Sequence, residues 1–375
     1  MVVLLISLIF IRPFISSLAF PYLGAIYNEV FLIFLLLWVF LKGASIEKNS
    51  IIKFPLAFFI LALISSVFFS TNRLKSLYEL FTCLTGLFLF IITLNLTPKN
   101  KLRLINAVVY SGLIISLLAI YQYFFGFRHL LDYILKEKIV DNFAMDYIAQ
   151  KRVYFPFITP NALGGYLAMI ILLMFTRKTK VWLIIPLFAA LLLTKSMGAF
   201  LSVSLGLIIF LSLQGKLKKK TIILFCGLLV IGALVFFIRS TSEKDYMRPL
   251  FSAVMRLDYW KGAFNMIAAH PFVGVGLGNF NLNQTRYAHN SYLQIWAEIG
   301  TLGIISFLWL VWSFLKSGFS NIAVALDKKL LAGLIAAFAA FLISNFFDFS
   351  FYLPEIVFIW WVITGCLITI KKPTP

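Results

Sequence analysis

The sequence predicts an all-α protein that crosses a membrane many times. Of its 375 residues, 62% are apolar and only 13% are charged, whereas soluble chains are nearer half apolar and a quarter charged. So few polar side chains cannot cover a water-facing surface, and most of the surface must therefore face lipid. Cys83, Cys226 and Cys366 lie inside apolar runs without CxxC spacing, which predicts packing residues and neither disulfides nor metal ligands.

Apolar runs divide the chain into about 12 expected spans. A hydrocarbon core of about 30 Å needs roughly 20 helical residues. Runs of this kind lie near residues 2–20, 23–41, 54–70, 77–96, 104–125, 161–176, 181–194, 197–214, 221–238, 289–315, 330–346 and 353–370. The first run lacks the basic segment and the cleavage site of a signal peptide, so we expect it to remain as the first span. The whole chain, residues 1–375, is expected to form one transmembrane domain.

The positive charge of the chain has a topological explanation. The net charge is +19, from 33 Lys and Arg against 14 Asp and Glu, which in a soluble protein would indicate a nucleic-acid partner. Here the bases concentrate in the loops that follow the even-numbered spans, where Glu47 and Asp327 are the only acids. Because Lys and Arg accumulate in cytoplasmic loops, both termini are predicted to be cytoplasmic, and no nucleic acid is expected to bind.

Two long loops, residues 126–160 and 239–288, fall on the outer side in this topology. The first contains an amphipathic stretch over residues 130–139, and the second has Trp260 and Phe264 at helical spacing. Such helices are expected to lie in the membrane interface beside a cavity that opens outward. Functional residues tend to lie on loops, so the chemistry is predicted there.

The densest group of unusual residues precedes and enters the tenth span. Gly274, Gly276 and Gly278 form a string that lacks the Gly-Lys-Ser/Thr of a phosphate-binding loop, so we expect a tight loop whose backbone approaches a ligand. Arg286 and His289 follow. Imidazole suits general-base chemistry near neutral pH, and arginine binds phosphate bidentately. The alternative is an interfacial histidine that tips its ring into water.

These motifs resemble those of the O-antigen ligase and O-antigen polymerase superfamily of membrane glycosyltransferases. The resemblance rests on His289-Asn290 followed after nine residues by Gly300-x-x-Gly303, and on three earlier segments: Arg256…Trp260…His270-Pro271…Gly274-x-Gly276-x-Gly278-Asn279-Phe280, Arg152…Phe157…Pro160-Asn161-Ala162-Leu163-Gly164, and Thr194-Lys195-Ser196-Met197-Gly198-Ala199. Recognisable motifs cover residues 150–315, and hydropathy extends the resemblance to the whole chain.

The resemblance implies a GT-C-like architecture and a metal-independent, inverting transfer without a cofactor. The implied donor is a glycan on undecaprenyl pyrophosphate, and the implied acceptor is lipid A–core at the periplasmic face of a bacterial inner membrane. The resemblance implies His289 as the general base and Asp348 as an acid that orients it, or alternatively that forms a salt bridge. The substrate-binding residues implied are Arg152, Asn161, Lys195, Arg256, Arg286 and Asn290.

One position departs from the family pattern. Met197 stands where the family's Ser-Arg-Gly motif has its arginine. Lys195 is expected to replace that charge as a point cation or to extend to lipid headgroups. Glu298 lies nine residues from His289, on roughly the opposite helix face, and is expected to form a structural ion pair.

Other functions remain open from the sequence. An O-antigen polymerase, with a second lipid-linked glycan as acceptor, would share the donor half of the site, as would a transferase to a protein hydroxyl. A 12-span transporter or flippase is the rival from another class, but it would carry ionisable groups near the bilayer midplane. The residues singled out here cluster at one face, which favours surface chemistry.

Overall fold

The computed structural model describes most of the chain. The described residues are 1–46, 50–137, 142–176, 181–216, 227, 230, 232–235, 237, 249–282, 285–322, 325 and 327–368. They form helices joined by short loops, with an isolated bridge between Leu282 and Thr285. The predicted span 221–238 is described only at seven of its residues, and the loop residues 239–248 lie outside the described part.

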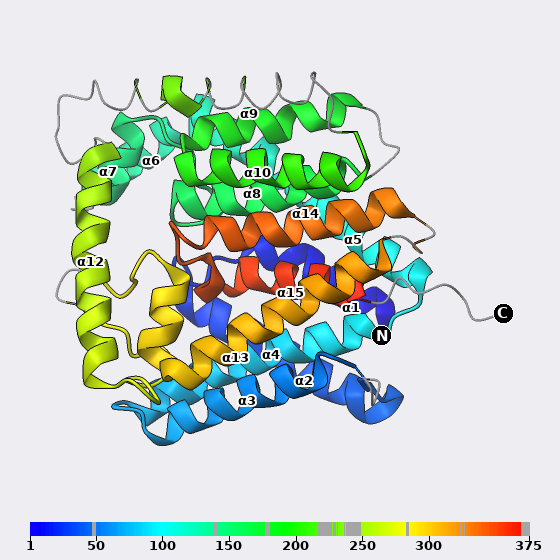
Figure 1. Ribbon diagram of the computed structural model, residues 1–375. Coiled ribbons are helices and arrows are strands. Elements are labelled where there is room, and N and C mark those ends of the chain that lie inside the picture. Colours follow the sequence, from blue (N-terminus) through cyan, green and yellow to red (C-terminus); the bar gives the residue numbers. More distant parts are fainter. Residues whose placement is uncertain are drawn as a thin grey trace.

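The described residues form fourteen α-helices, which Figure 1 labels. Their bounds are α1 Val2–Ile11, α2 Pro21–Lys42, α3 Lys53–Phe68, α4 Arg73–Leu94, α5 Pro98–Tyr121, α6 Phe127–Lys136, α7 Asn142–Ala149, α8 Pro160–Met174, α9 Ile184–Thr194, α10 Met197–Leu213, α12 Pro249–Ala269, α13 Ser291–Asn321 and α14 Lys328–Ser344, followed by α15 Pro354–Ile368. Short 3-10 turns lie at Arg12–Phe14, Val181–Leu183 and Ser350–Tyr352, and a π-helix spans Gln122–Gly126. Most helices run side by side, while α12 crosses one end of the bundle (Figure 1).

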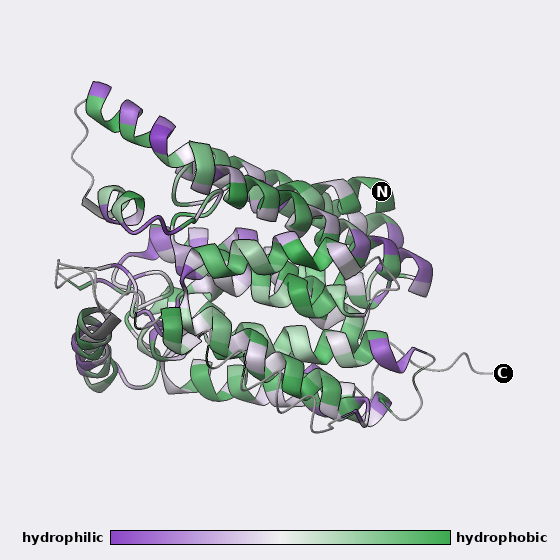
Figure 2. Ribbon diagram, turned by 90° about the horizontal axis from the view of Figure 1, so that it is seen from above, coloured by the Kyte–Doolittle hydropathy of each residue, from purple (hydrophilic) through white to green (hydrophobic). Residues whose placement is uncertain are grey.

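The distribution of polarity along the bundle fits a membrane protein. Hydrophobic residues fill the middle of the helices, and hydrophilic residues gather at the two ends (Figure 2). In the described part of the chain, four helices are long and apolar enough to cross a membrane: Pro21–Lys42, Arg73–Leu94, Pro98–Lys136 and Ser291–Asn321. Shorter apolar helices accompany them. The prediction of an all-α membrane architecture is therefore confirmed at this level.

Two helices form the interior of the bundle. Nearly every residue of α8 and of α15 is buried, and α14 contacts both of them. A helix that is apolar all round is a buried helix, and these two sequences are apolar on every face. They therefore face other helices and not lipid, although hydropathy alone places them among the spans.

Glycines allow close helix contacts in this interior. A Cβ atom on Gly86 would lie 2.5 Å from the Trp361 ring, and one on Gly206 would lie 2.4 Å from Leu172 Cδ1. Small residues at helix interfaces are typical of membrane bundles, because lipid supplies no hydrophobic drive for association and packing has to supply it.

One continuous helical segment extends beyond the length of a span. α5, the π-helix and α6 run without a break from Pro98 to Lys136. At 1.5 Å per residue these 39 residues reach about 58 Å, nearly twice a hydrocarbon core. The amphipathic stretch predicted in the loop 126–160 is therefore a helix, and it continues α5 towards the end of the bundle that carries α7 and α12 (Figure 1).

Candidate active site

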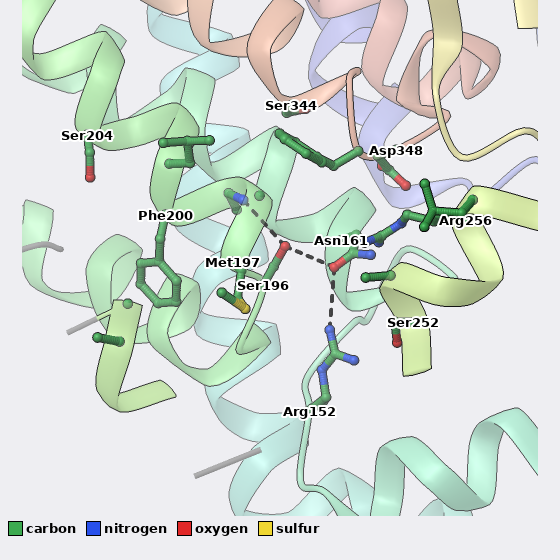
Figure 3. Close-up of a pocket in the computed structure, with 18 of the residues that line it drawn as sticks. Arg152, Asn161, Ser196, Met197, Phe200, Ser204, Ser252, Arg256, Ser344 and Asp348 are labelled. Carbon is green, nitrogen blue, oxygen red and sulfur yellow. Dashed lines mark hydrogen bonds between the residues drawn. The ribbon is translucent and has the colours of Figure 1, made fainter. Parts of the chain in front are cut away.

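A cavity of about 590 Å³ lies where α8, α10 and α14 meet α12 (Figure 3). Its polar lining consists of Arg152, Asn161, Ser196, Ser204, Ser252, Arg256, Ser344 and Asp348. Its apolar lining includes Met197, Phe200, Leu201, Leu257, Trp260 and Phe347. Arg256 and Asp348 lie together at one end, whereas Phe200 and Ser204 lie at the other (Figure 3). The cavity therefore combines a charged end with an apolar wall.

A hydrogen-bond network fixes one side of the charged end. Arg152 Nε donates to the Thr194 carbonyl at 3.1 Å, and its Nη2 donates to Asn161 Oδ1 at 3.4 Å. Ser196 Oγ donates to the same Asn161 oxygen at 2.9 Å. Arg152 is only 7% exposed, so the network holds a nearly buried guanidinium at the cavity wall.

Two helices begin at this network. Thr159 caps α8 by accepting from the Ala162 N–H, and Asn161 lies in the first turn of α8. Ser196 caps α10 by accepting from the Ala199 N–H. The free N–H groups and the dipole of a helix N-terminus favour an anion. Together with Arg152, these two N-terminal turns make this side of the cavity suited to a phosphate group.

α12 supplies the opposite wall. Ser252, Arg256 and Trp260 line the cavity at intervals of four residues, which is the spacing of one helix face. Burial lowers the pKa of Arg256, and Asp348 opposes that shift. Asp348 is 3% exposed and accepts a hydrogen bond from Ser350 Oγ. Burial raises the pKa of Asp348, and the nearby positive charge of Arg256 counteracts it.

His289 lies beside this wall but does not line the cavity. Its ring stacks on Tyr259 with centroids 5.7 Å apart and meets Phe349 edge-on at 5.1 Å. Burial, followed by the positive charge of Arg256, lowers the pKa of His289 from 6.5 to about 4. The imidazole is therefore neutral near pH 7 and able to accept a proton.

Asn290 caps the N-terminus of α13. Its Oδ1 accepts from the Tyr292 and Leu293 N–H groups. This cap places His289 directly before the first turn of α13, in the left-handed region at φ +50°.

The glycine string, Gly274 to Gly278, packs against other segments of this chain. The prediction that its backbone approaches a ligand is therefore wrong. A Cβ on Gly274 would lie 2.3 Å from the Glu298 backbone carbon, and one on Gly276 would lie 2.4 Å from Ser70 Oγ. The N–H groups of Val275 and Gly276 donate to the Ala297 and Glu298 carbonyls. These carbonyls are available because α13 is interrupted at Gly300, where φ is +74°.

Glu298 completes this contact, and the prediction of an ion pair is wrong, because no cation among the described residues pairs with this carboxylate. Its carboxylate accepts from the Gly278 and Phe280 N–H groups at 2.8 and 3.3 Å and from Gln294 Nε2 at 3.0 Å. A buried carboxylate needs hydrogen bonds or an opposite charge. Here backbone donors of the glycine string satisfy it, so the string locks the N-terminal part of α13 in place.

Two predicted phosphate ligands lie apart from the cavity. Lys195 ends α9 in the left-handed region, and its Nζ donates to the Gln150 carbonyl at 2.7 Å. Arg286 is exposed. Neither is among the residues that line the cavity. Met197, which stands where the family motif has its arginine, does line it.

Sequence reasoning missed several residues of the site. The sequence indicates Ser196 only as part of a motif and does not indicate Ser252. It places Trp260 on an interfacial helix face with Phe264, whereas in the structure Trp260 lines the cavity. The four-residue spacing of Ser252, Arg256 and Trp260 was the available signal, since it places all three on the face that carries Arg256.

Comparison with known proteins supports a polysaccharide ligase of the O-antigen ligase type. Residues 181–308 match the family model described as O-antigen ligase. This match confirms the resemblance predicted from the motifs, and the long apolar helices support a multi-pass membrane protein.

Named relatives agree with this family. A candidate polysaccharide ligase of Rickettsia conorii is 27% identical over 80% of this chain and 74% of its own length. One of Rickettsia bellii is 27% identical over 81% of this chain and 76% of its own length. One of Rickettsia felis is 28% identical over 54% of each chain, so the chain spans about half the length of that relative.

Proposed function

We propose that this protein is an O-antigen ligase, an inverting and metal-independent glycosyltransferase that moves a glycan from undecaprenyl pyrophosphate onto lipid A–core. The observation that carries the proposal is the cavity, where Arg152, Arg256 and the first turns of α8 and α10 meet an apolar wall. A lipid pyrophosphate has this combination of charge and apolar chain. Anion-binding groups set in advance stabilise charge as it develops in a transition state.

The leaving pyrophosphate is the group that the arginines are proposed to stabilise. As the bond between the anomeric carbon and the phosphate oxygen breaks, the bonding electrons pass to pyrophosphate. Arg152 and Arg256 can each bind phosphate oxygens with two parallel N–H donors. Lys195 and Arg286 remain predicted phosphate ligands, and we expect them to contribute less, because neither lines the cavity.

His289 is proposed to accept the proton of the acceptor. The acceptor hydroxyl attacks the anomeric carbon from the face opposite the leaving group, which inverts its configuration, and its proton passes to the neutral imidazole. Asp348 is proposed to act on this base through Arg256, since Arg256 interacts with both groups. Asn161 and Asn290 keep the two halves of the site in place through their hydrogen bonds.

The proposed function also requires a particular orientation of the protein in the membrane. We propose about 12 spans in a GT-C-like arrangement in a bacterial inner membrane, with both termini cytoplasmic and the outer loops 126–160 and 239–288 periplasmic. In support, α6, α7 and α12 lie at the end of the bundle that carries the cavity, and the N-terminus lies at the other end (Figure 1). Labelling of single cysteines from either side of sealed vesicles tests this orientation.

A reconstituted transfer assay tests the proposed function. Purified protein in vesicles receives a glycan on undecaprenyl pyrophosphate together with two competing acceptors, lipid A–core and a second lipid-linked glycan. We expect glycan on lipid A–core. We expect His289→Ala to lower kcat at least a hundredfold, whereas His270→Ala, at an exposed histidine, serves as the matched control.

Three outcomes would contradict parts of the proposal. Longer lipid-linked chains without capped lipid A–core would identify a polymerase. Movement of the lipid-linked glycan between leaflets without transfer would identify a flippase. Full activity of His289→Ala would exclude this residue as the base, whichever acceptor is used.

A further inference from the structure

The imidazole of His289 is held by aromatic rings. The Tyr259 ring lies nearly parallel to it, with an interplanar angle of 26°, and the Phe349 ring stands nearly perpendicular, at 82°. Tyr287 in turn stacks on Phe349 with centroids 4.0 Å apart and an angle of 9°. Three segments of the chain therefore meet around one histidine: α12, the loop before α13 and the connection after α14.

The described residues offer the ring of His289 no hydrogen bond at Nδ1, which is buried. A histidine that acts as a base is usually oriented by a hydrogen bond to its second nitrogen. The Asp348 carboxylate instead accepts from Ser350 Oγ. Aromatic contacts are therefore the interactions that can fix the orientation of the imidazole.

The backbone at His289 is fixed as well. Its φ of +50° lies in the left-handed region, which is uncommon for a non-glycine residue. On one side, the Ala288 N–H donates to Gln294 Oε1 at 3.1 Å. On the other side, Asn290 caps α13. With the backbone held, contact with Tyr259 decides where the ring lies.

We propose that Tyr259 is a positioning residue for His289, which holds the imidazole by stacking and excludes water from it. This inference rests on the proposed function, because it gives the proposed base its geometry. Tyr259 lies one helical turn after Arg256, so the helix face that supplies a phosphate ligand also supplies the ring that orients the base. Binding of the donor and placement of the base are thereby coupled through α12.

The charged and titratable groups around His289 determine the pH dependence. These are Arg256 and Tyr259 from α12, Tyr287 from the loop before α13 and Asp348 after α14. Burial and Arg256 lower the pKa of His289 to about 4. The neutral ring is the active form, so activity is expected to persist down to about pH 4 and to fall below it. Exposure of the ring moves this limit towards the ordinary pKa of 6.5.

Nuclear magnetic resonance titration tests the proposal without reference to turnover. The chain contains three histidines, His129, His270 and His289, so the spectrum of His289→Gln assigns the third signal. We expect a midpoint near 4 for His289 in the native protein and in Tyr259→Phe, which keeps the ring. In Tyr259→Leu the midpoint is expected to rise by one to two pH units. Phe264→Leu, on the same helix, is the matched control.

Kinetics test the positioning. At pH 7.5 the imidazole is mostly neutral in every variant, so protonation of the ring does not lower the rate. A raised pKa makes the ring a stronger base and would by itself raise the rate, so a fall in kcat reports lost positioning. We expect Tyr259→Leu to lower kcat about tenfold with KM unchanged, Tyr259→Phe to restore it, and the acid limit of kcat/KM to move with the measured midpoint. Phe349→Leu opens the other face of the imidazole and is expected to shift the midpoint in the same direction, which supplies a second variant.

The two proposals fail separately. A native His289 midpoint near 6.5, or an unchanged midpoint in both Tyr259→Leu and Phe349→Leu, would overturn the role of Tyr259 even if the protein transfers glycan. Full turnover of His289→Ala would overturn the base while leaving the titration result intact.

Discussion

Two regions of the molecule differ in whether their buried polar groups have hydrogen-bond partners: the contact between the glycine string and α13, and the cavity beside α12. Where the glycine string meets α13, the Glu298 carboxylate accepts three hydrogen bonds and the carbonyls freed at Gly300 accept from the string. At the cavity, Trp260 Nε1 and Asp348 Oδ1 are buried and have no partner among the described residues. Saturated polar groups rigidify a structure, whereas unsatisfied ones are costly and call for a specific explanation. We therefore assign the first region to the scaffold, and the unsatisfied groups of the second are consistent with the proposed substrate site.

The largest expected effect lies in the scaffold. Gly300→Ala places a Cβ 2.1 Å from the Phe272 carbonyl oxygen at a φ of +74°, so both space and backbone conformation oppose it. We expect a loss of more than about 4 kcal/mol in the free energy of unfolding, measured as loss of folded protein in detergent. Gly227→Ala, where no atom lies within 4 Å of the added Cβ, is the control. A stable Gly300→Ala protein would contradict the assignment of this region as scaffold.

Among the substrate-binding residues, Arg256→Ala is expected to have the largest effect on catalysis. Loss of a donor that stabilises developing charge lowers kcat/KM by about 10² to 10³, with little change in thermal stability. Arg256→Lys should recover part of the rate, because it restores the charge without the planar fork. Arg128→Ala, at an exposed position of α6, is the matched control. Equal losses for both arginines would show that the effect is not specific to the cavity.

Glu298→Gln tests whether the carboxylate in the scaffold contributes to stability and not to catalysis. Glutamine keeps the shape but replaces one acceptor oxygen with a donor, so at least one hydrogen bond of the glycine string is lost. We expect the free energy of unfolding to fall by about 1 to 3 kcal/mol, measured by denaturant titration, with kcat per folded molecule retained. Glu137→Gln, at the exposed end of α6, should leave stability unchanged. A large fall in kcat without loss of stability would instead place Glu298 in the chemistry.

The smallest expected effect is that of Asn161→Ala. Its Oδ1 accepts from both Arg152 and Ser196, so its removal frees the guanidinium to move without removing the charge. We expect kcat/KM to fall about tenfold, in line with the loss of a hydrogen bond to a charged group. Steady-state kinetics measure it, with Asn106→Ala on α5 as control. No change in kcat/KM would mean that Arg152 needs no support from Asn161.

The apolar runs predicted an all-helical architecture because the length and polarity of a run are local properties of the chain. The helix caps that the structure shows at Thr97, Thr159 and Ser196 are local as well, since capping depends only on neighbouring residues. Arg152, Asn161, Arg256 and Asp348 were also named in advance, and the structure brings all four to one cavity. The glycine string and Glu298 were misread, because a glycine required by a ligand and one required by a packed helix look alike in sequence.

The sequence by itself determined the apolar helices, their ends and the kinds of residue available for phosphate and proton chemistry. Only the tertiary structure decided which of these residues act together. Segments around residues 152, 196, 256 and 348 meet because α12 crosses the end of the bundle (Figure 1), and Lys195 and Arg286 are left outside the cavity. Such contacts depend on the packing of helices distant in sequence, and no local pattern encodes them. For the same reason, the rings that surround His289 became visible only in the folded chain.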